Sequence, residues 1–157
     1  MKIILLVVGK TDHPLYTQAV EDYRKRVLRY LPFEIAVIPD LRNRRNLSES
    51  QQKEKEGELI LKSLEADDYC VLLDEKGKEY SSENFAAYVE GKMHTVRKRL
   101  VFVVGGPYGF AEEVYAASAD RVSLSRMTFS HQMIRLLFAE QLYRALTILH
   151  NEPYHHR

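Results

Sequence analysis

The sequence has a single cysteine, Cys70, so it lacks any possible intrachain disulfide. Cys70 lies within the apolar run 69–73, where it packs most simply as a small hydrophobic side chain. A protein without disulfides is typical of a reducing compartment, and the cytoplasm is the simplest location. The sequence also lacks a cysteine pair, a His-x-x-x-His spacing and a dense loop of carboxylates, so we expect no bound metal.

Long hydrophobic runs are missing as well. No window reaches the roughly 18 uncharged apolar residues that a membrane-spanning helix needs. The apolar segment near the C-terminus is interrupted by Arg135, Glu140 and Arg144. The apolar start, residues 1–8, is not followed by a small-residue cleavage site and is not expected to be a signal peptide. We therefore expect no membrane partner.

The sequence contains few glycines and prolines, and its positive and negative charges are nearly balanced. Seven glycines and five prolines in 157 residues, with 45% hydrophobic and 29% charged residues, predict one globular domain spanning residues 1–157. The formal net charge of +1 gives no overall attraction for polyanions. Nucleic-acid binding would need local patches, and the basic clusters at 42–45, 97–99 and 155–157 are candidates, although most such clusters are solvated surface.

Short apolar runs alternate with amphipathic segments along the chain. The runs are rich in β-branched residues and predict strands at 3–8, 33–38, 69–73, 100–104 and 121–124. Apolar positions three and four residues apart predict helices at 14–31, 49–64, 82–94, 112–117 and 133–149. Ser48 with Gln51 is a possible capping signal for the second helix, and Ser81 or Ser82 can cap the third. This alternation predicts an α/β domain with a mainly parallel sheet and helices on both faces.

Three loops begin where predicted strands end: after Leu73, at Gly105-Gly106 and after Leu124. Ligands of parallel sheets bind at these ends, because loop amides and helix N-termini converge there. The glycine loop matches neither the Gly-x-x-x-x-Gly-Lys-Ser/Thr phosphate loop nor the dinucleotide fingerprint. No Gly-x-Ser-x-Gly motif supports a hydrolase. The sequence therefore predicts a ligand site formed by three loops.

The segment before the last predicted helix mixes hydroxyl and apolar residues. Ser125 and Thr128 supply hydroxyls and free amides near the expected site, and Ser130 is a natural N-cap for the helix. Met127 and Phe129 are expected to lie in the core, because both are large and apolar.

The last predicted helix carries two arginines on an otherwise apolar surface. Arginine is rarely buried without an acidic or phosphate partner, so Arg135 and Arg144 need one. Glu140 can pair with Arg144 at i and i+4. A histidine in the first turn, as His131 is, is more often a solvent-facing or internally hydrogen-bonded residue than a functional one. The surplus of apolar surface predicts a subunit interface and hence a dimer.

Six motifs spread over the whole chain are shared with one known family. They are KEKEG at 53–57, LD at 73–74, GGPYG at 105–109, LSRMTFSH at 124–131, EQLYRA at 140–145 and PYH at 153–155. With them the chain resembles the RlmH-type (YbeA-like) SPOUT methyltransferases of bacterial large-subunit ribosomal RNA. Ser130 stands where some relatives have a proline.

This resemblance implies a parallel sheet with a deep C-terminal trefoil knot, a homodimer, and S-adenosylmethionine bound in the knot. It implies methylation of N3 of a pseudouridine in ribosomal RNA, either as free RNA or in the large ribosomal subunit or assembled ribosome. The resemblance implies catalytic roles for Arg144, Tyr154 and His155, and it makes His131 a weaker catalytic candidate. The implied cofactor contacts are Leu73, Gly105, Leu124, Ser125, Arg126, Met127, Thr128 and Phe129.

The chemistry of the implied reaction assigns hypothetical roles to these residues. The imide nitrogen of pseudouridine must lose its proton, and histidine is the usual base near neutral pH, so His155 is the first hypothesis. Arg144 would hold a phosphate or the developing anionic carbonyl. Which histidine takes the proton, and whether the tail acts in its own subunit or in its neighbour, stays open.

Two further hypotheses belong to other functional classes. One is a non-catalytic RNA-binding or ribosome-binding protein that has the same fold. The other is a flavodoxin-like or receiver domain, which fits the element order, although the first strand ends in Gly9-Lys10-Thr11 without the acidic pair of a receiver.

Overall fold

The computed structural model of the protein describes residues 1–42 and 44–156, and its centre is a five-stranded sheet. All neighbouring strands pair in parallel, in the order β2-β1-β4-β3-β5. Because the strands are parallel, all of them end at one edge of the sheet, the carboxyl edge. The strands are β1 (Lys2–Val8), β2 (Phe33–Ile38), β3 (Tyr69–Glu79), β4 (Arg99–Val104) and β5 (Asp120–Ser123).

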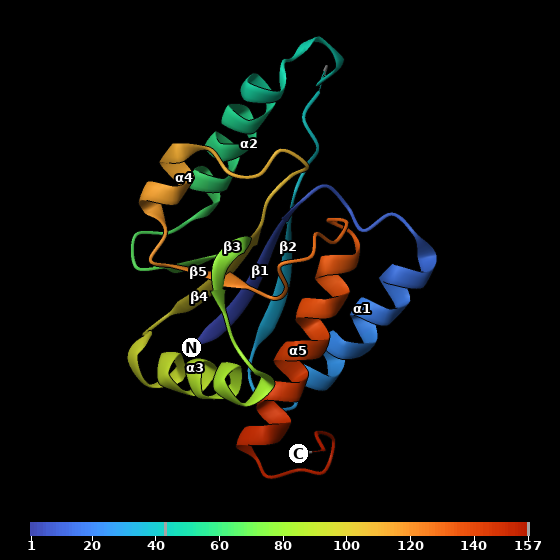
Figure 1. The fold of residues 1–157 in the computed structure, drawn as a ribbon, viewed down its shortest axis with the longest axis vertical. Helices are drawn as coiled ribbons and strands as arrows, with labels where there is room; N and C mark the ends of the chain where they lie inside the picture. Colours follow the sequence, from blue (N-terminus) through green and yellow to red (C-terminus); the bar gives the residue numbers. More distant parts are fainter. Residues whose placement is uncertain (43, 157) are drawn as a thin grey trace.

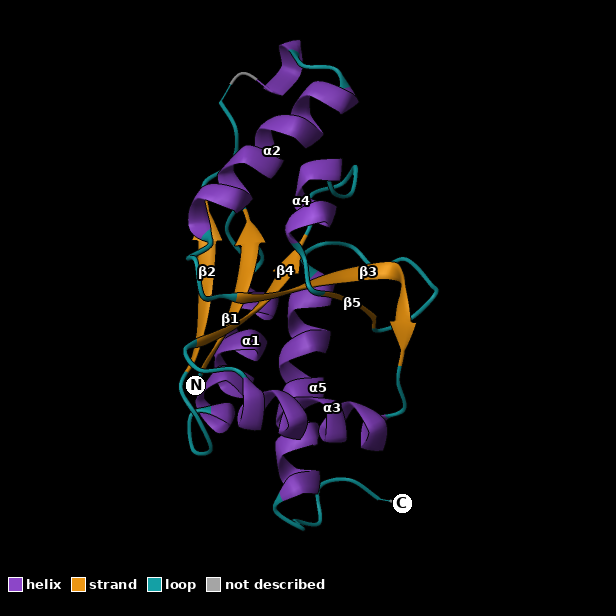
Figure 2. Cartoon of the chain, turned by 90° about the vertical axis from the view of Figure 1, so that its left-hand side faces the viewer, coloured by secondary structure: helices purple, strands orange, loops and turns teal. Residues whose placement is uncertain are grey.

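Helices cover both faces of the sheet (Figure 1 and Figure 2). One face carries α1 (Pro14–Val27), α3 (Ser82–Thr95) and α5 (Met133–Leu149), with α5 packed between the other two. The opposite face carries α2 (Glu49–Ser63), which follows a 3-10 turn at Arg44–Asn46, and α4 (Glu112–Ala117). The α/β fold with a parallel sheet between helical layers is therefore confirmed.

The apolar runs are buried on both sides of the sheet, as the sequence predicts for parallel strands. In β1, Ile3, Leu5 and Val7 pack toward α1, α3 and α5. The alternate residues Ile4 and Leu6 pack toward α2 and α4. A strand covered on both faces needs apolar residues at every position, which explains its continuous hydrophobic run.

Helix α1 ends at Val27, earlier than the predicted end at Leu31. The next residues form a tight turn in which the amides of Tyr30 and Leu31 both donate to the carbonyl of Val27. Pro32 follows, and a residue directly before proline is disfavoured in helical conformation. The apolar spacing therefore continues past the helix itself.

Strand β3 continues to Glu79, beyond the predicted end at Leu73. Its pairing with β5 shifts register between Leu73 and Lys78, and Figure 2 shows the strand bending sharply near its end. A Cβ on Gly77 would lie 2.8 Å from the backbone of Arg121, so only glycine allows this close approach. The polar sequence of the extension is typical of a turn, which is why the prediction stopped too early.

The capping predictions are confirmed for α2 and α3. Ser48 and Gln51 form a complete capping box, and Ser81 accepts from the amide of Asn84. For α5 the prediction of Ser130 as the cap residue is wrong, because the cap residue is Gln132. The Ser130 hydroxyl nevertheless accepts from the amide of Met133 at 3.1 Å, since the chain turns tightly before the helix.

Cys70 is 3% exposed, as expected for a small core residue. Burial raises the pKa of its thiol to about 11. Within residues 1–42 and 44–156, no helix is both long and apolar enough to cross a bilayer, and no group of three or more potential metal ligands occurs. Asn43, which falls within the range of the first basic cluster, and Arg157, which belongs to the third, lie outside the described residues.

Candidate functional site

The three predicted loops meet around one cavity of about 380 Å³ at the carboxyl edge. Strand β3 contributes Leu73, at the point where its pairing with β5 shifts register, the end of β4 contributes Gly105, and the segment after β5 contributes Leu124 and its successors. Ile134, in the first turn of α5, completes the wall. This convergence follows from parallel strand order, because β4, β3 and β5 are neighbours that end at the same edge.

The segment from β5 to α5 passes over this cavity, and two of its side chains differ from expectation. Met127 is 75% exposed and Phe129 is 38% exposed, so their prediction as core residues is wrong. Both line the cavity from its solvent side, since the segment crosses the edge of the sheet rather than entering the core. Large apolar residues kept near water in a cavity wall are typical of a ligand site.

Two hydrogen bonds tie this segment to the extension of β3. Thr128 Oγ1 donates to the Glu75 carboxylate at 2.6 Å, and Arg126 Nε donates to Glu79 at 2.9 Å. The side chain of Ser125 is used within the segment, accepting from the amide of Met127 at 3.0 Å. Arg126 is not in the wall of the cavity, whereas the other implied cofactor contacts are.

The glycine loop after β4 is held by close packing. Gly109 has φ +82°, in the left-handed region that favours glycine. A Cβ on Gly105 would lie 3.2 Å from the ring of Phe110, which itself lines the cavity. A Cβ on Gly106 would overlap the carboxylate of Glu56, so any side chain there displaces either the loop or that carboxylate.

Glu56 is a buried carboxylate next to the site, and the sequence assigned it no role. It is 5% exposed, and Gln52 Nε2 donates to its Oε1 at 2.8 Å. Burial raises the pKa of Glu56 above its ordinary value, while the hydrogen bond from Gln52 opposes the shift. Its position in the shared 53–57 motif is the only signal in the sequence that could have found it.

The charged groups of the cavity wall are acidic. Asp74 and Glu75 lie in the wall, and the hydroxyl of Tyr115 donates to Asp74 at 2.7 Å. Burial and this hydrogen bond raise the pKa of Tyr115 to about 12, so the phenol stays protonated at neutral pH. The arrangement favours a ligand with a positive charge.

Arg135 is completely buried behind the site, and its partners differ from expectation. Instead of a carboxylate or phosphate, its guanidinium donates to the carbonyls of Val8, Gly9 and His131 and to the hydroxyl of Thr11, at 2.8 to 3.1 Å. Burial lowers the pKa of Arg135. The side chain thus ties the end of β1 to the start of α5.

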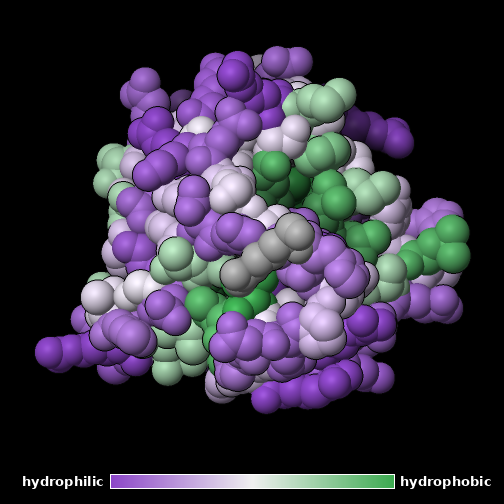
Figure 3. Space-filling model, turned by 60° about the horizontal axis from the view of Figure 1, so that its bottom comes forward, coloured by the Kyte–Doolittle hydropathy of each residue, from purple (hydrophilic) through white to green (hydrophobic). Residues whose placement is uncertain are grey.

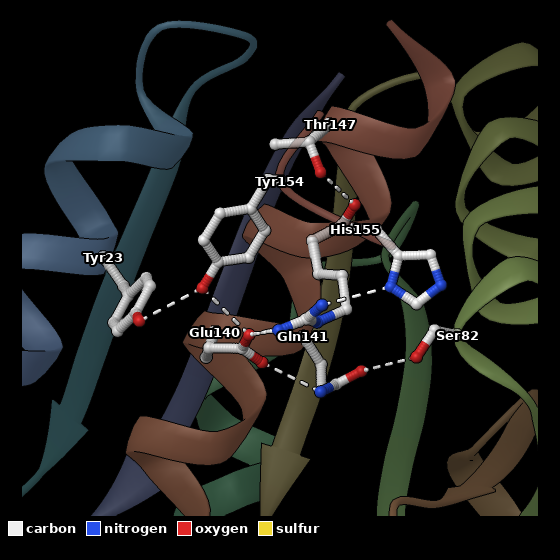
Figure 4. A network of polar contacts seen from close by, with 8 residues as sticks. Tyr23, Ser82, Glu140, Gln141, Thr147, Tyr154 and His155 are labelled. Atoms are coloured by element: carbon white, nitrogen blue, oxygen red, sulfur yellow. Dashed lines mark hydrogen bonds and ion pairs between the residues drawn. The ribbon is translucent and has the colours of Figure 1, made fainter. Parts of the chain in front are cut away.

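A second cluster of polar groups lies near the opposite end of α5 (Figure 4). Arg144 donates to Glu140 through Nε at 3.0 Å, which confirms the predicted i,i+4 pair. Tyr154 donates to the same carboxylate at 3.1 Å and contacts the hydroxyl of Tyr23 at 3.2 Å. Burial raises the pKa of Tyr154 above its ordinary value.

The C-terminal tail is docked against the body of the protein by this cluster. The ring of Tyr154 packs edge-on against Tyr143 at 4.7 Å between centroids. Arg144 Nη1 lies 3.1 Å from Nδ1 of His155. Arginine can only donate, so Nδ1 accepts and a neutral ring carries its hydrogen on Nε2. In this arrangement Nδ1 has no lone pair left for a substrate proton.

Of the four predicted catalytic residues, the fold brings three together and places the fourth elsewhere. Arg144, Tyr154 and His155 form the cluster at the C-terminal end of α5, whereas His131 lies in the cavity wall at its N-terminal end. At 1.5 Å per residue, the helix separates the cavity from Arg144 by about 15 Å. One chain by itself therefore does not bring the tail to the cavity.

The comparisons with known proteins cover almost the entire chain. The family model described as "Predicted SPOUT methyltransferase" matches residues 1–155. Two proteins, one of Parabacteroides distasonis and one of Bacteroides thetaiotaomicron, are 66% and 59% identical to this chain over 156 residues. In both comparisons 99% of each chain is covered. A protein of Christiangramia forsetii is 56% identical over 157 residues, with 100% of both chains covered. All three relatives are named ribosomal RNA large subunit methyltransferase H. The chain belongs to the SPOUT methyltransferase family.

Proposed function

We propose that the protein is a cytoplasmic S-adenosylmethionine-dependent methyltransferase that modifies N3 of a pseudouridine in ribosomal RNA of the large subunit. The observation that carries this proposal is the three-loop cavity, which contains seven of the eight cofactor contacts implied by the family resemblance: Leu73, Gly105, Leu124, Ser125, Met127, Thr128 and Phe129. The names of the relatives support ribosomal RNA as the substrate.

The residues of the cavity fit the proposed cofactor. Its volume of about 380 Å³ falls within the range of about 300 to 1,000 Å³ typical of small-ligand sites. Leu73, Leu124 and Ile134 offer apolar surface for an adenosine, and Gly105 leaves backbone accessible beside them. The carboxylates of Asp74 and Glu75 suit a cationic sulfonium.

The chain has to align the reactants and remove a proton. Bound S-adenosylmethionine supplies a methyl group that its sulfonium sulfur already makes electrophilic. The cavity walls orient the cofactor and exclude water, which together account for most of the rate in such reactions. The imide proton needs a base, and His155 is proposed for it once its Nδ1 leaves Arg144.

We further propose that the active enzyme is a homodimer in which the tail of one subunit reaches the cavity of the other. The roughly 15 Å between the cavity and Arg144 supports this arrangement, since one chain does not bridge it. Met133, Leu137, Glu140 and Arg144 share the outward face of α5 and are each only half-buried. Hydrophobic patches also reach the surface among hydrophilic residues at the C-terminal end of the molecule (Figure 3).

The trefoil knot implied by the family stays a prediction. Its support is the route of the chain: after the edge strand β5, the segment 124–132 returns along the extension of β3 and enters α5 between α1 and α3 (Figure 1). A trefoil knot requires a segment that passes back over neighbouring strands, as this one does.

Transfer of labelled methyl groups to ribosomes from cells that lack the enzyme tests the proposed function. We expect one methyl group per large subunit, which mass mapping places on a pseudouridine. Gly105→Val should abolish cofactor binding in calorimetry, because its side chain presses on Phe110 and narrows the cavity. Gly91→Val is the matched control, since a Cβ there meets nothing within 4 Å. Ribosome binding without methyl transfer would instead support a non-catalytic binding protein.

A further inference from the structure

A second cavity, of about 630 Å³, lies at the carboxyl edge beside the first. The ends of β1 and β2 form it, together with the loops that follow these strands. His131 lines both cavities, and Gln132 lines only the second. The residues just before α5, His131 and Gln132, therefore separate the two cavities. A group bound in either cavity lies next to His131.

The second cavity is lined by two cations, Lys10 and Arg44, and two carboxylates, Asp12 and Asp40. Lys10 is exposed in its wall and pairs with no carboxylate of the described residues, whereas Arg44 pairs with Asp40 at 3.5 Å. Behind the wall, the buried guanidinium of Arg135 donates to backbone carbonyls and, within residues 1–42 and 44–156, has no carboxylate at ion-pair distance. With Asp12 as the remaining acidic residue, the charges of the wall balance, and the buried Arg135 behind it adds one further cation. The first cavity has acidic walls, whereas the second presents the exposed ammonium of Lys10, to which a phosphate can bind.

The second cavity also has an apolar surface and fixed polar groups. Val37, next to the last residue of the edge strand β2, is 44% exposed, and Pro39 continues this apolar strip. Gln132 is held in place because its Nε2 donates to the carbonyl of Lys10 at 3.0 Å and its Oε1 accepts from the amide of Asp12 at 3.2 Å. A flat base can lie on such a strip while its edge meets donors and acceptors in the wall.

We propose that the second cavity binds the nucleotide that receives the methyl group, with its base on Val37 and its phosphate near Lys10. This proposal rests on the proposed function. A uracil-type base has two carbonyl acceptors and N–H donors, which match the cationic and carboxylate groups in the wall. His131 then faces both the acceptor base and the methyl donor, which gives a physical reason for its place between the cavities.

Blocking the second cavity tests the proposal sterically. Val37→Trp extends an exposed side chain into the cavity and leaves the core unchanged. We expect it to raise KM for large ribosomal subunits by about tenfold or more, with the affinity for S-adenosylmethionine within about twofold of the wild type. Leu28→Trp, at a residue that is 43% exposed at the end of α1, is the matched control and should leave both values unchanged.

Removing the charge of Lys10 tests the proposal electrostatically, in case the tryptophan variant does not fold. Lys10→Ala should weaken equilibrium binding of large subunits and reduce the slope of log affinity against log salt by about 1, as loss of one phosphate contact does. Lys62→Ala, at an exposed lysine near the end of α2, should leave the slope unchanged.

Equilibrium binding of large ribosomal subunits, measured without S-adenosylmethionine, tests the acceptor site separately from the proposed methyl transfer. Wild-type binding by both Val37→Trp and Lys10→Ala would overturn the acceptor site, even if methyl transfer is intact. Weaker binding by both variants would support the site, even if the wild-type protein transferred no methyl group and the proposed function failed.

Discussion

Glu56 is a residue whose charge should affect stability. Its pKa is raised in the folded protein, so folding favours the protonated form, and stability is lost as pH rises from the ordinary value of 4.5 through the raised one. Glu56→Gln removes this loss and keeps an acceptor for Gln52. We expect a higher melting temperature than wild type at about pH 8, with the difference vanishing near about pH 4. A difference that is constant over this range would show that the charge of Glu56 is not its cause.

His155 is the residue on which proton removal depends in the proposed mechanism. His155→Ala should lower the single-turnover rate of methyl transfer by about a hundredfold or more, the usual contribution of a general base. Cofactor affinity should not change, because the residue lies outside the cavity wall. His156→Ala, the exposed neighbour, serves as the control and should retain the wild-type rate. A wild-type rate for His155→Ala would exclude it as the base.

At the scale of elements, the glycine loop after β4 depends on the helix packed beneath it. Gly106→Ala places a Cβ against the buried Glu56 carboxylate, so the loop or that side chain must shift, and urea unfolding should show a loss of about 1 to 3 kcal/mol, as for other overpacked sites. Gly91→Ala, in the exposed middle of α3, should instead gain about 0.5 to 1 kcal/mol. Equal stabilities for the two variants would show that Gly106 does not need its free space.

The elements that the sequence predicts well are those whose cause is local. Buried parallel strands need continuous apolar runs, and helix starts need capping residues such as Ser48 and Ser81, so both could be recognised along the chain. The end of β3 could not, because its polar extension is stabilised by pairing with a strand far away in sequence. The same holds for the exposure of Met127 and Phe129, which follows from the route of the chain over the sheet.

The sequence predicted which loops form the candidate site, but it did not predict the buried side-chain contacts behind that site. Strand ends could be located from the sequence, and parallel order then brings them to one edge. The partners of Arg135 could not be predicted, since backbone carbonyls of β1 leave no trace in residue types. Glu56 was missed for a related reason: its burial depends on how α2 lies against the glycine loop.

At the scale of the whole molecule, the cavity and the tail cluster occupy opposite ends of α5. Mixed dimers test whether two chains share a site. Gly105→Val lacks the cavity, His155→Ala lacks the base, and each alone should be inactive. If the tail acts on the neighbouring subunit, mixing them restores one complete site in each mixed dimer, and activity should return. A mixture as inactive as its components would show that the tail acts within its own chain.

The most direct measurement is a crystal structure of the protein with S-adenosylmethionine. We expect adenosine in the cavity of about 380 Å³, between Leu73, Gly105 and the segment 124–129, with the sulfonium facing His131. Density for the cofactor at any other place, with this cavity empty, would contradict it.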